Sequence, residues 1–134
     1  VMLVHWLGDM HCPKHIRYPD DQTTGYYKVK WRGRSVRYHD VWDGIFFDPL
    51  HPWGFNDCAE MLDDCDKSEI KAITAGNVYD WGVDIAKRAR CVNEFKEGDV
   101  IDIHAFRIKY RNLAETAVRD AGYRLAKLFS DLFE

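Results

Sequence analysis

Histidine and aspartate residues cluster near the start of the chain at spacings that suit metal binding. Four of the six histidines lie within the first 39 residues, and His5/Asp9 and His39/Asp43 each stand four residues apart. Side chains four apart project from the same face of a helix. Imidazole nitrogen and carboxylate oxygen are ligands of Zn²⁺, and sites that hold several metal ions suit phosphoester hydrolysis. The pattern therefore predicts a metal site with hydrolytic chemistry.

Two isolated ion pairs are the alternative explanation of this pattern. A His and an Asp four apart on a helix usually form a solvated pair that adds little to stability. Both pairs here lie in strongly apolar segments, residues 3–7 and 41–46. Because a buried ionisable pair needs a partner, these surroundings favour a metal. The spacing alone leaves both explanations open.

The elements that must position these side chains are mostly helical. The apolar pattern predicts a buried helix over residues 1–12, which ends before a proline, and a second helix over residues 38–47. Residues 27–31 and 35–38 alternate between apolar and polar, which predicts a β-hairpin. We therefore expect the two His/Asp pairs on two different helices, separated by the hairpin.

The second half of the chain is predicted to be helical as well. Residues 57–75 suit one or two short helices, and Asp80 is a candidate N-cap for a helix that runs to about residue 95. Apolar residues at spacings of three and four predict one long amphipathic helix over residues 106–132. The predicted fold class is all-α with one small β-hairpin.

Length and charge limit the class of protein. The chain has 134 residues, with 19 Lys+Arg against 22 Asp+Glu and a formal charge of −3. This length fits one domain with a real core. The chain is too apolar to be disordered and too nearly neutral to be held on nucleic acid by bulk charge alone. No apolar run reaches the roughly 18 residues of a membrane span.

The cysteines and the basic hairpin each allow two interpretations. Cys58 and Cys65 lie in an acidic stretch and are candidates for a local disulfide, which would indicate an oxidising compartment; two unpaired thiols are the alternative. Basic residues alternate with aromatic ones over residues 27–38. They would suit a single-stranded nucleic acid, whose bases stack on aromatic rings, but a solvated basic face is the interpretation that we favour.

Three sequence motifs resemble the S1/P1 nuclease family of zinc-dependent single-strand nucleases and 3′-nucleotidases. Residues 3–15, LVHWLGDMHCPKH, look like the family's LVHxxGDxHQPLH motif. Residues 37–43, RYHDVWD, resemble its NLHxVWD motif, and residues 121–126, AGYRLA, are similar to a sequence near its C-terminus. The resemblance spans the whole chain and implies the all-α fold that the family shares with zinc-dependent phospholipase C.

The resemblance also implies three zinc ions and a set of ligands for them. His5 and Asp9 would bind a pair of zincs, with the catalytic Asp9 carboxylate bridging them, and His15, His39 and Asp43 would bind the third. The implied reaction is cleavage of P–O3′ bonds in single-stranded DNA or RNA and in 3′-nucleotides, which leaves 5′-phosphorylated products.

Other positions are assigned by the same resemblance or depart from it. His11 matches a position that is not a ligand, so we expect it to orient a carboxylate from outside the ligand set. Tyr26 and Tyr27 are candidates for stacking on a substrate base. Cys12 stands where the family has Gln, which leaves a disulfide or a soft metal ligand open. Thr24 and Tyr26 flank Gly25 where the family has Gly-Gly-Asn, so an Asn expected near the phosphate is absent.

Part of the implied zinc site has no counterpart in this sequence. The family's paired-zinc site also uses an N-terminal Trp and further His and Asp residues from its N-terminal half. We therefore expect residues 1–134 to be the C-terminal portion of a larger single domain. A missing N-terminal segment, in the same polypeptide or as a separate chain, would complete the site, and this chain alone would complete only one zinc site. The resemblance implies a secreted or otherwise extracytoplasmic protein, the cell surface included.

Two other functions are compatible with the same ligands. A phospholipase C-like zinc phosphodiesterase would keep the metals and act on a different substrate. A non-catalytic domain, structural or nucleic-acid-binding, would need only the single zinc site that this chain completes.

Overall fold

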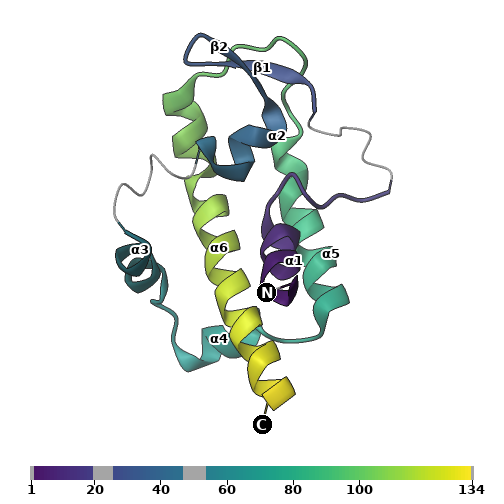
Figure 1. Ribbon diagram of the computed structural model, residues 1–134, viewed down its shortest axis with the longest axis vertical. Coiled ribbons are helices and arrows are strands. Elements are labelled where there is room, and N and C mark those ends of the chain that lie inside the picture. The colour runs from purple at the N-terminus through teal and green to yellow at the C-terminus, as the bar shows by residue number, and fades with distance from the viewer. Residues whose placement is uncertain (1, 20–25, 47–53, 134) are drawn as a thin grey trace.

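A computed structural model describes residues 2–19, 26–46 and 54–133 of the chain. Within these ranges the chain is mostly helical with one antiparallel hairpin, as the sequence predicts. The elements, shown in Figure 1, are α1 (Met2–His11), β1 (Lys28–Trp31), β2 (Arg34–Arg37), α2 (Tyr38–Asp40), the π-helical turn η1 (Val41–Ile45), α3 (Phe55–Leu62), α4 (Lys67–Ile73), α5 (Val78–Ala89), the 3₁₀ turn η3 (Arg90–Val92) and α6 (Ile103–Phe133).

The long helix α6 is the element against which the others pack. Helices α1, α3 and α4 contact α6, and α1 also contacts α5 (Figure 1). The hairpin lies at one end of the molecule beside α2, and α4 lies at the opposite end. The predicted long amphipathic helix is confirmed, and Asp102 begins it by accepting hydrogen bonds from the backbone N–H groups of His104 and Ala105. Among the described residues, no helix is both long and apolar enough to cross a membrane.

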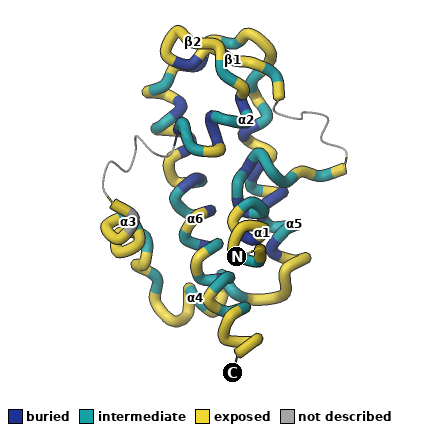
Figure 2. Tube along the Cα trace, viewed as in Figure 1, coloured by how far each residue is buried: buried dark blue, intermediate teal, exposed yellow. Residues whose placement is uncertain are grey.

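A cluster of buried aromatic residues forms the core. Figure 2 shows buried positions at α2 and along α6. The Phe106 ring of α6 is at the centre of this cluster, with its centroid 5.0 Å from that of Phe46, 5.6 Å from that of Trp42 and 4.7 Å from that of Tyr110. Tyr38 and Trp42 are both buried in this core. Tyr38 directly precedes His39, and Trp42 directly precedes Asp43. The core therefore fixes the segment that carries the second His/Asp pair.

The hairpin divides its side chains between this core and solvent. Val29 and Trp31 are buried, whereas Lys28 and Lys30 are exposed, as alternation in a strand requires. The turn at Arg32 and Gly33 has positive φ at both residues (50° and 73°), which suits a two-residue hairpin loop. The aromatic rings of the basic hairpin therefore pack inward, and the solvated basic face is the interpretation that the structure supports.

The boundaries of one predicted helix need correction. The N-cap of α5 is Asn77 and not Asp80: the Asn77 side chain accepts hydrogen bonds from the N–H groups of Tyr79 and Asp80, and the Asp80 carboxylate accepts from the Asn77 N–H. Asp80 is thus the second member of a capping box. The helix ends at Ala89 and not near residue 95. For the helix predicted over residues 38–47, the last residue lies outside the described ranges.

Of the two interpretations of Cys58 and Cys65, the structure supports unpaired thiols. Cys58 and Cys65 are both free thiols, as are Cys12 and Cys91. Cys58 lies in α3 and Cys65 in the loop that follows it, where the backbone N–H of Cys65 donates to the hydroxyl of Tyr123 on α6. The acidic loop is therefore attached to α6 by a hydrogen bond and not closed on α3 by a covalent bond.

Candidate metal centre

The end of α1 and the turn after it place three of the predicted ligands together. His5 and Asp9 lie on one face of α1, with His5 Nε2 3.2 Å from Asp9 Oδ2. Pro13 stops the helix. Two hydrogen bonds, from Cys12 N–H to Asp9 C=O and from His15 N–H to Cys12 C=O, then turn the chain back. As a result, His15 Nδ1 lies 3.6 Å from the other Asp9 oxygen, Oδ1.

The second pair lies on α2 and η1. The Phe46 N–H donates to the Val41 C=O, five residues earlier, which is the hydrogen bond of a π-helical turn. Such turns occur frequently at functional sites because they redirect one side chain within a helix. Here the wider turn carries Asp43, whose Oδ2 lies 3.9 Å from His39 Nε2.

The two segments meet at His15. His15 Nε2 lies 3.2 Å from Asp43 Oδ1 and 3.1 Å from His39 Nε2, and the two imidazole rings stack with centroids 4.6 Å apart. All five predicted ligands, His5, Asp9, His15, His39 and Asp43, therefore form one continuous group, which we call the His/Asp cluster. The sequence motifs predicted these residues, and the structure brings every one of them together.

Three donors of the cluster lie close enough together to share one ion. His15 Nε2 lies 3.1 Å from His39 Nε2 and 3.2 Å from Asp43 Oδ1, while the other oxygen of Asp43, Oδ2, lies 3.9 Å from His39 Nε2. Donors at the corners of a tetrahedron with bonds of about 2.1 Å lie about 3.4 Å apart, so the separations from His15 are near this value. Imidazole nitrogen and carboxylate oxygen are donors that zinc accepts, so the residues fit zinc.

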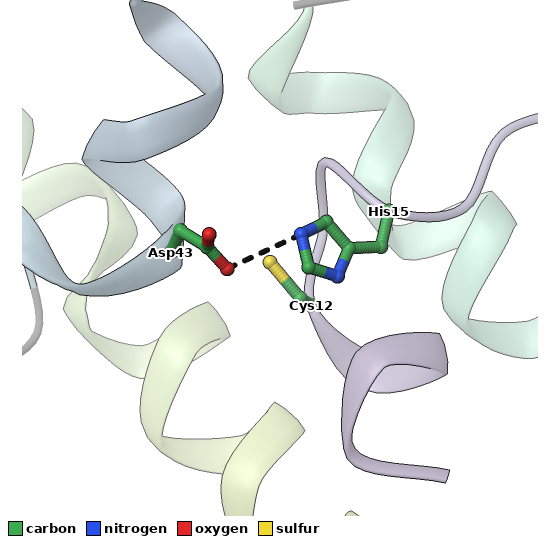
Figure 3. Close-up of side chains that lie close together, drawn as sticks. All are labelled: Cys12, His15 and Asp43. Atoms are coloured by element: carbon green, nitrogen blue, oxygen red, sulfur yellow. Dashed lines mark ion pairs between the residues drawn. The ribbon is translucent and has the colours of Figure 1, made fainter. Parts of the chain in front are cut away.

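Cys12 joins this cluster from the turn after α1. Its Sγ, one nitrogen of His15 and one oxygen of Asp43 all lie within 4.8 Å of one another (Figure 3). The thiol is directed at η1, where it lies 3.7 Å from the C=O of Trp42. Burial, with a smaller contribution from the Asp43 carboxylate, raises the pKa of Cys12 to about 11. The thiol is therefore protonated at neutral pH unless a metal displaces its proton.

A cavity of about 580 Å³ opens beside the cluster. Asp9, His15 and His39 line it, and so does Tyr26, whose ring stacks on that of His39 with centroids 5.4 Å apart. This volume is in the range of sites for small organic ligands. The remaining lining residues are Trp6, Met10, Lys14, Ile16, Arg17 and Asn93.

Sequence reasoning did not identify the cationic and amide residues of this cavity. Lys14 lies within the first motif and Arg17 two residues after it, and two positive charges beside a cluster with two carboxylates were a signal that could have been used. Asn93 gave no signal, because it reaches the cavity only through the fold. Its Oδ1 accepts a hydrogen bond from Lys14 Nζ at 2.6 Å, across 79 residues of sequence.

Tyr27 lies away from the cavity, unlike its neighbour Tyr26. Its ring stacks on the buried Tyr38 with centroids 5.5 Å apart, and its hydroxyl is buried without a hydrogen-bond partner among the described residues. Burial raises the pKa of Tyr27 to about 12. Of the two tyrosines proposed from the sequence as substrate contacts, the structure thus places Tyr26 at the cavity and Tyr27 in the core.

His11 does not orient a carboxylate of the cluster, contrary to the prediction from the sequence. Its Nδ1 donates to the Leu7 C=O (2.8 Å), and its Nε2 accepts from Arg124 Nη1 (2.9 Å). Burial lowers the pKa of His11, which favours the neutral ring that this arrangement needs. Both nitrogens are occupied on the side of α1 that packs on α6, so His11 anchors the helix.

Arg124 extends this anchor to two more elements. Its Nε donates to the C=O of Ile73 (2.9 Å) and its Nη2 to Asp84 Oδ2 (2.9 Å). Arg88 bonds to the same Asp84 and to the buried Asp120 of α6. Arg124 belongs to the third sequence motif and His11 to the first. Their contact therefore fixes α1 on the side that packs on α6.

The fold and the cluster define a helical protein with a candidate metal centre of imidazole, carboxylate and thiol donors beside a cavity. Over residues 1–134 the chain matches the family model described as S1/P1 Nuclease, and it belongs to that family.

Two relatives in Arabidopsis thaliana are similar to this chain. Endonuclease 2 is 27% identical over 134 residues, and Endonuclease 4 is 24% identical over 135 residues. The alignments cover 86% and 96% of this chain but 46% and 42% of those proteins, so the chain spans less than half the length of these relatives. No solved structure gives a significant match.

Proposed function

We propose that the protein acts in zinc-dependent cleavage of P–O3′ bonds in single-stranded DNA or RNA and in 3′-nucleotides, leaving 5′-phosphorylated products. The observation that carries this proposal is the convergence of His5, Asp9, His15, His39 and Asp43 beside one cavity. Membership of the S1/P1 nuclease family and similarity to proteins named endonucleases support the choice of substrate.

Asp9 lies between the two parts of the cluster. Its Oδ2 faces His5 and its Oδ1 faces His15. From the family resemblance we assign His5 and Asp9 to the paired zincs, with Asp9 as the bridging carboxylate, and His15, His39 and Asp43 to the third. Zinc in such a centre supplies a Lewis acid that activates water and neutralises charge that develops on the phosphate.

The residues around the cavity provide the substrate contacts. The ammonium of Lys14 and the guanidinium of Arg17 place positive charge where a phosphate would enter, and charge-assisted hydrogen bonds to phosphate are among the stronger polar contacts. The exposed rings of Tyr26 and Trp6 offer flat apolar faces on which an unpaired base can stack. Both kinds of contact are independent of sequence, which suits a single-strand nuclease.

The His5/Asp9 side of the centre offers too few ligands to hold two ions. We propose that an N-terminal segment outside residues 1–134, in the same polypeptide or as a separate chain, supplies the remaining ligands. The length of the Arabidopsis relatives, more than twice the matched part, supports this division.

The test combines metal analysis with substrate choice on the protein as purified from its source. We expect bound zinc and hydrolysis of both 3′-AMP and a single-stranded oligonucleotide, with loss of both activities on chelation. Turnover of a phosphatidylcholine analogue without turnover of 3′-AMP would show a phospholipase C-like enzyme instead. One zinc ion per chain with no hydrolysis of any of these substrates would show a non-catalytic single-zinc domain.

A further inference from the structure

The thiol of Cys12 lies beside the donors assigned to the ion at His15, His39 and Asp43. His15 Nε2 lies 3.1 Å from His39 Nε2 and 3.2 Å from Asp43 Oδ1. The Sγ of Cys12 lies within 4.8 Å of the His15 and Asp43 donors, and Figure 3 shows it between them. Zinc in proteins accepts nitrogen, oxygen and sulfur donors in one tetrahedral shell.

The local chain geometry supports a chelate. Cys12 and His15 are three residues apart on one turn, and the hydrogen bond from His15 N–H to the Cys12 C=O (3.0 Å) holds that turn closed. A gap of two residues between ligands is common in zinc sites. On the opposite side, the thiol approaches Trp42, the residue before Asp43, so Cys12 bridges the end of α1 and η1.

We propose that Cys12 is a thiolate ligand of this ion, which gives it a closed shell of one sulfur, two imidazole nitrogens and one carboxylate. The proposal rests on the metal centre of the proposed function. On binding, the S–H bond is replaced by a sulfur–zinc bond and one proton is released to solvent for each ion bound.

Two consequences separate this site from the His5/Asp9 side. With Cys12 bound, the four protein ligands would fill a tetrahedral shell and would join the end of α1 to η1. A thiolate also selects soft or borderline ions such as Zn²⁺ and Co²⁺ over Mg²⁺ and Ca²⁺, which prefer oxygen ligands.

Cobalt(II) is the probe that tests the ligand directly. Co²⁺ is added to the metal-free protein, to Cys12→Ser and to Cys12→Gln, the second of which restores the residue of the family motif. Cys91→Ser is the matched control, since Cys91 is an exposed free thiol outside the cluster. We expect a near-ultraviolet thiolate-to-cobalt charge-transfer band in the wild type and in Cys91→Ser. Both Cys12 variants should lose this band and keep visible bands of bound cobalt.

Zinc affinity and thiol protection give further readouts. We expect the tightest zinc site to weaken in Cys12→Ser by at least the roughly tenfold to hundredfold that loss of an outer-shell partner costs. Zinc should also protect Cys12, but not Cys91, from alkylation in the wild type, as measured by mass spectrometry of peptides. This measurement holds even where a variant fails to fold.

The outcomes distinguish this inference from the proposed function. Visible cobalt bands without a charge-transfer band in the wild type would overturn the role of Cys12 and leave the metal centre standing. A charge-transfer band that survives in both Cys12 variants would also overturn it. Failure of the wild type to bind cobalt or zinc at all would overturn the metal centre itself, and the role of Cys12 with it.

Discussion

The two sides of the His/Asp cluster are built in different ways. The side chains of His15 and His39 are 18% and 17% exposed, whereas that of His5 is 65% exposed; the carboxylates are half exposed on both sides, at 46% for Asp9 and 52% for Asp43. His39 belongs to a segment whose neighbours are buried in the aromatic core. His5 and Asp9 project from a single helix into solvent. One side is thus held by the packed interior and the other only by the position of α1.

The surroundings of α1 sharpen this contrast. Met2, Val4 and Trp6 are large apolar residues near His5, and all three are exposed. Helix α1 is held from the opposite side by the buried contact of His11 with Arg124. Exposed apolar side chains at Met2 and Val4 beside His5 suit contact with further chain, in agreement with the N-terminal segment proposed above, while Trp6 lines the cavity. The comparison shows that the aromatic core holds the segment of His39 and Asp43 in place, whereas His5 and Asp9 depend on the position of α1.

The largest effect should come from the exposed side. Asp9→Asn removes a charge that the proposed function places between two ions, and we expect hydrolysis of 3′-AMP to fall by about a thousandfold or more, since metal-based charge stabilisation amounts to several kcal/mol. The melting temperature should barely change, because Asp9 is half exposed. Asp40→Asn is the control, since its ion pair with Arg37 is on the surface. Full activity in Asp9→Asn would refute the bridging role.

The positions of His39 and Asp43 should instead depend on the stability of the aromatic core. Phe106→Ala removes the ring at the centre of the aromatic cluster, and we expect the free energy of unfolding to fall by about 3–5 kcal/mol. Ile108→Ala is the matched control on the same helix, because Ile108 is 71% exposed and should change stability by less than about 0.5 kcal/mol. Urea denaturation measures both. Equal effects of the two substitutions would show that the aromatic cluster is not the core that positions His39 and Asp43.

Loss of the contact between Arg124 and His11 should have an intermediate effect on the free energy of unfolding. Arg124→Met leaves the Nε2 of His11 and the C=O of Ile73 without their donor, and we expect a loss of about 3 kcal/mol in the free energy of unfolding. Lys127→Met removes an exposed ion pair with Asp131 from the same helix and should cost less than about 0.5 kcal/mol. Denaturation curves of the two variants check this. A loss as small in Arg124→Met as in Lys127→Met would mean that α1 is held by other contacts.

The sequence predicted the residues of the His/Asp cluster better than the residues around it. An i, i+4 pair can be found by counting, and so can the periodic face of α6, because both depend on local helix geometry alone. The meeting of His15 with His39 depends on how the turn after α1 packs against η1, which residue spacing does not specify. The motif resemblance, in contrast, assigns both histidines to one zinc site.

The errors share a physical cause. His11 was expected to face a carboxylate, but its partner Arg124 is 113 residues away and reaches it only when α6 packs on α1. Asn93 was missed for the same reason. Asp80 was taken for an N-cap because Asp caps helices, although Asn77 three residues earlier has the same propensity and completes the capping box. Local propensity gives the type of element, whereas the partner of a buried polar group is decided by tertiary packing.

The smallest effect separates two adjacent tyrosines at the edge of the enclosed side. Tyr26 is 62% exposed and stacks on His39 at the cavity, so Tyr26→Ala should leave stability nearly unchanged. It should raise KM for a single-stranded oligonucleotide about tenfold, because stacking on one base contributes about 1–3 kcal/mol. Tyr27→Phe is the control: its hydroxyl is buried without a partner among the described residues, so its loss should be neutral or stabilising and leave KM unchanged. A KM that rises in Tyr27→Phe and not in Tyr26→Ala would place the substrate on the hairpin, and not in the cavity beside His39.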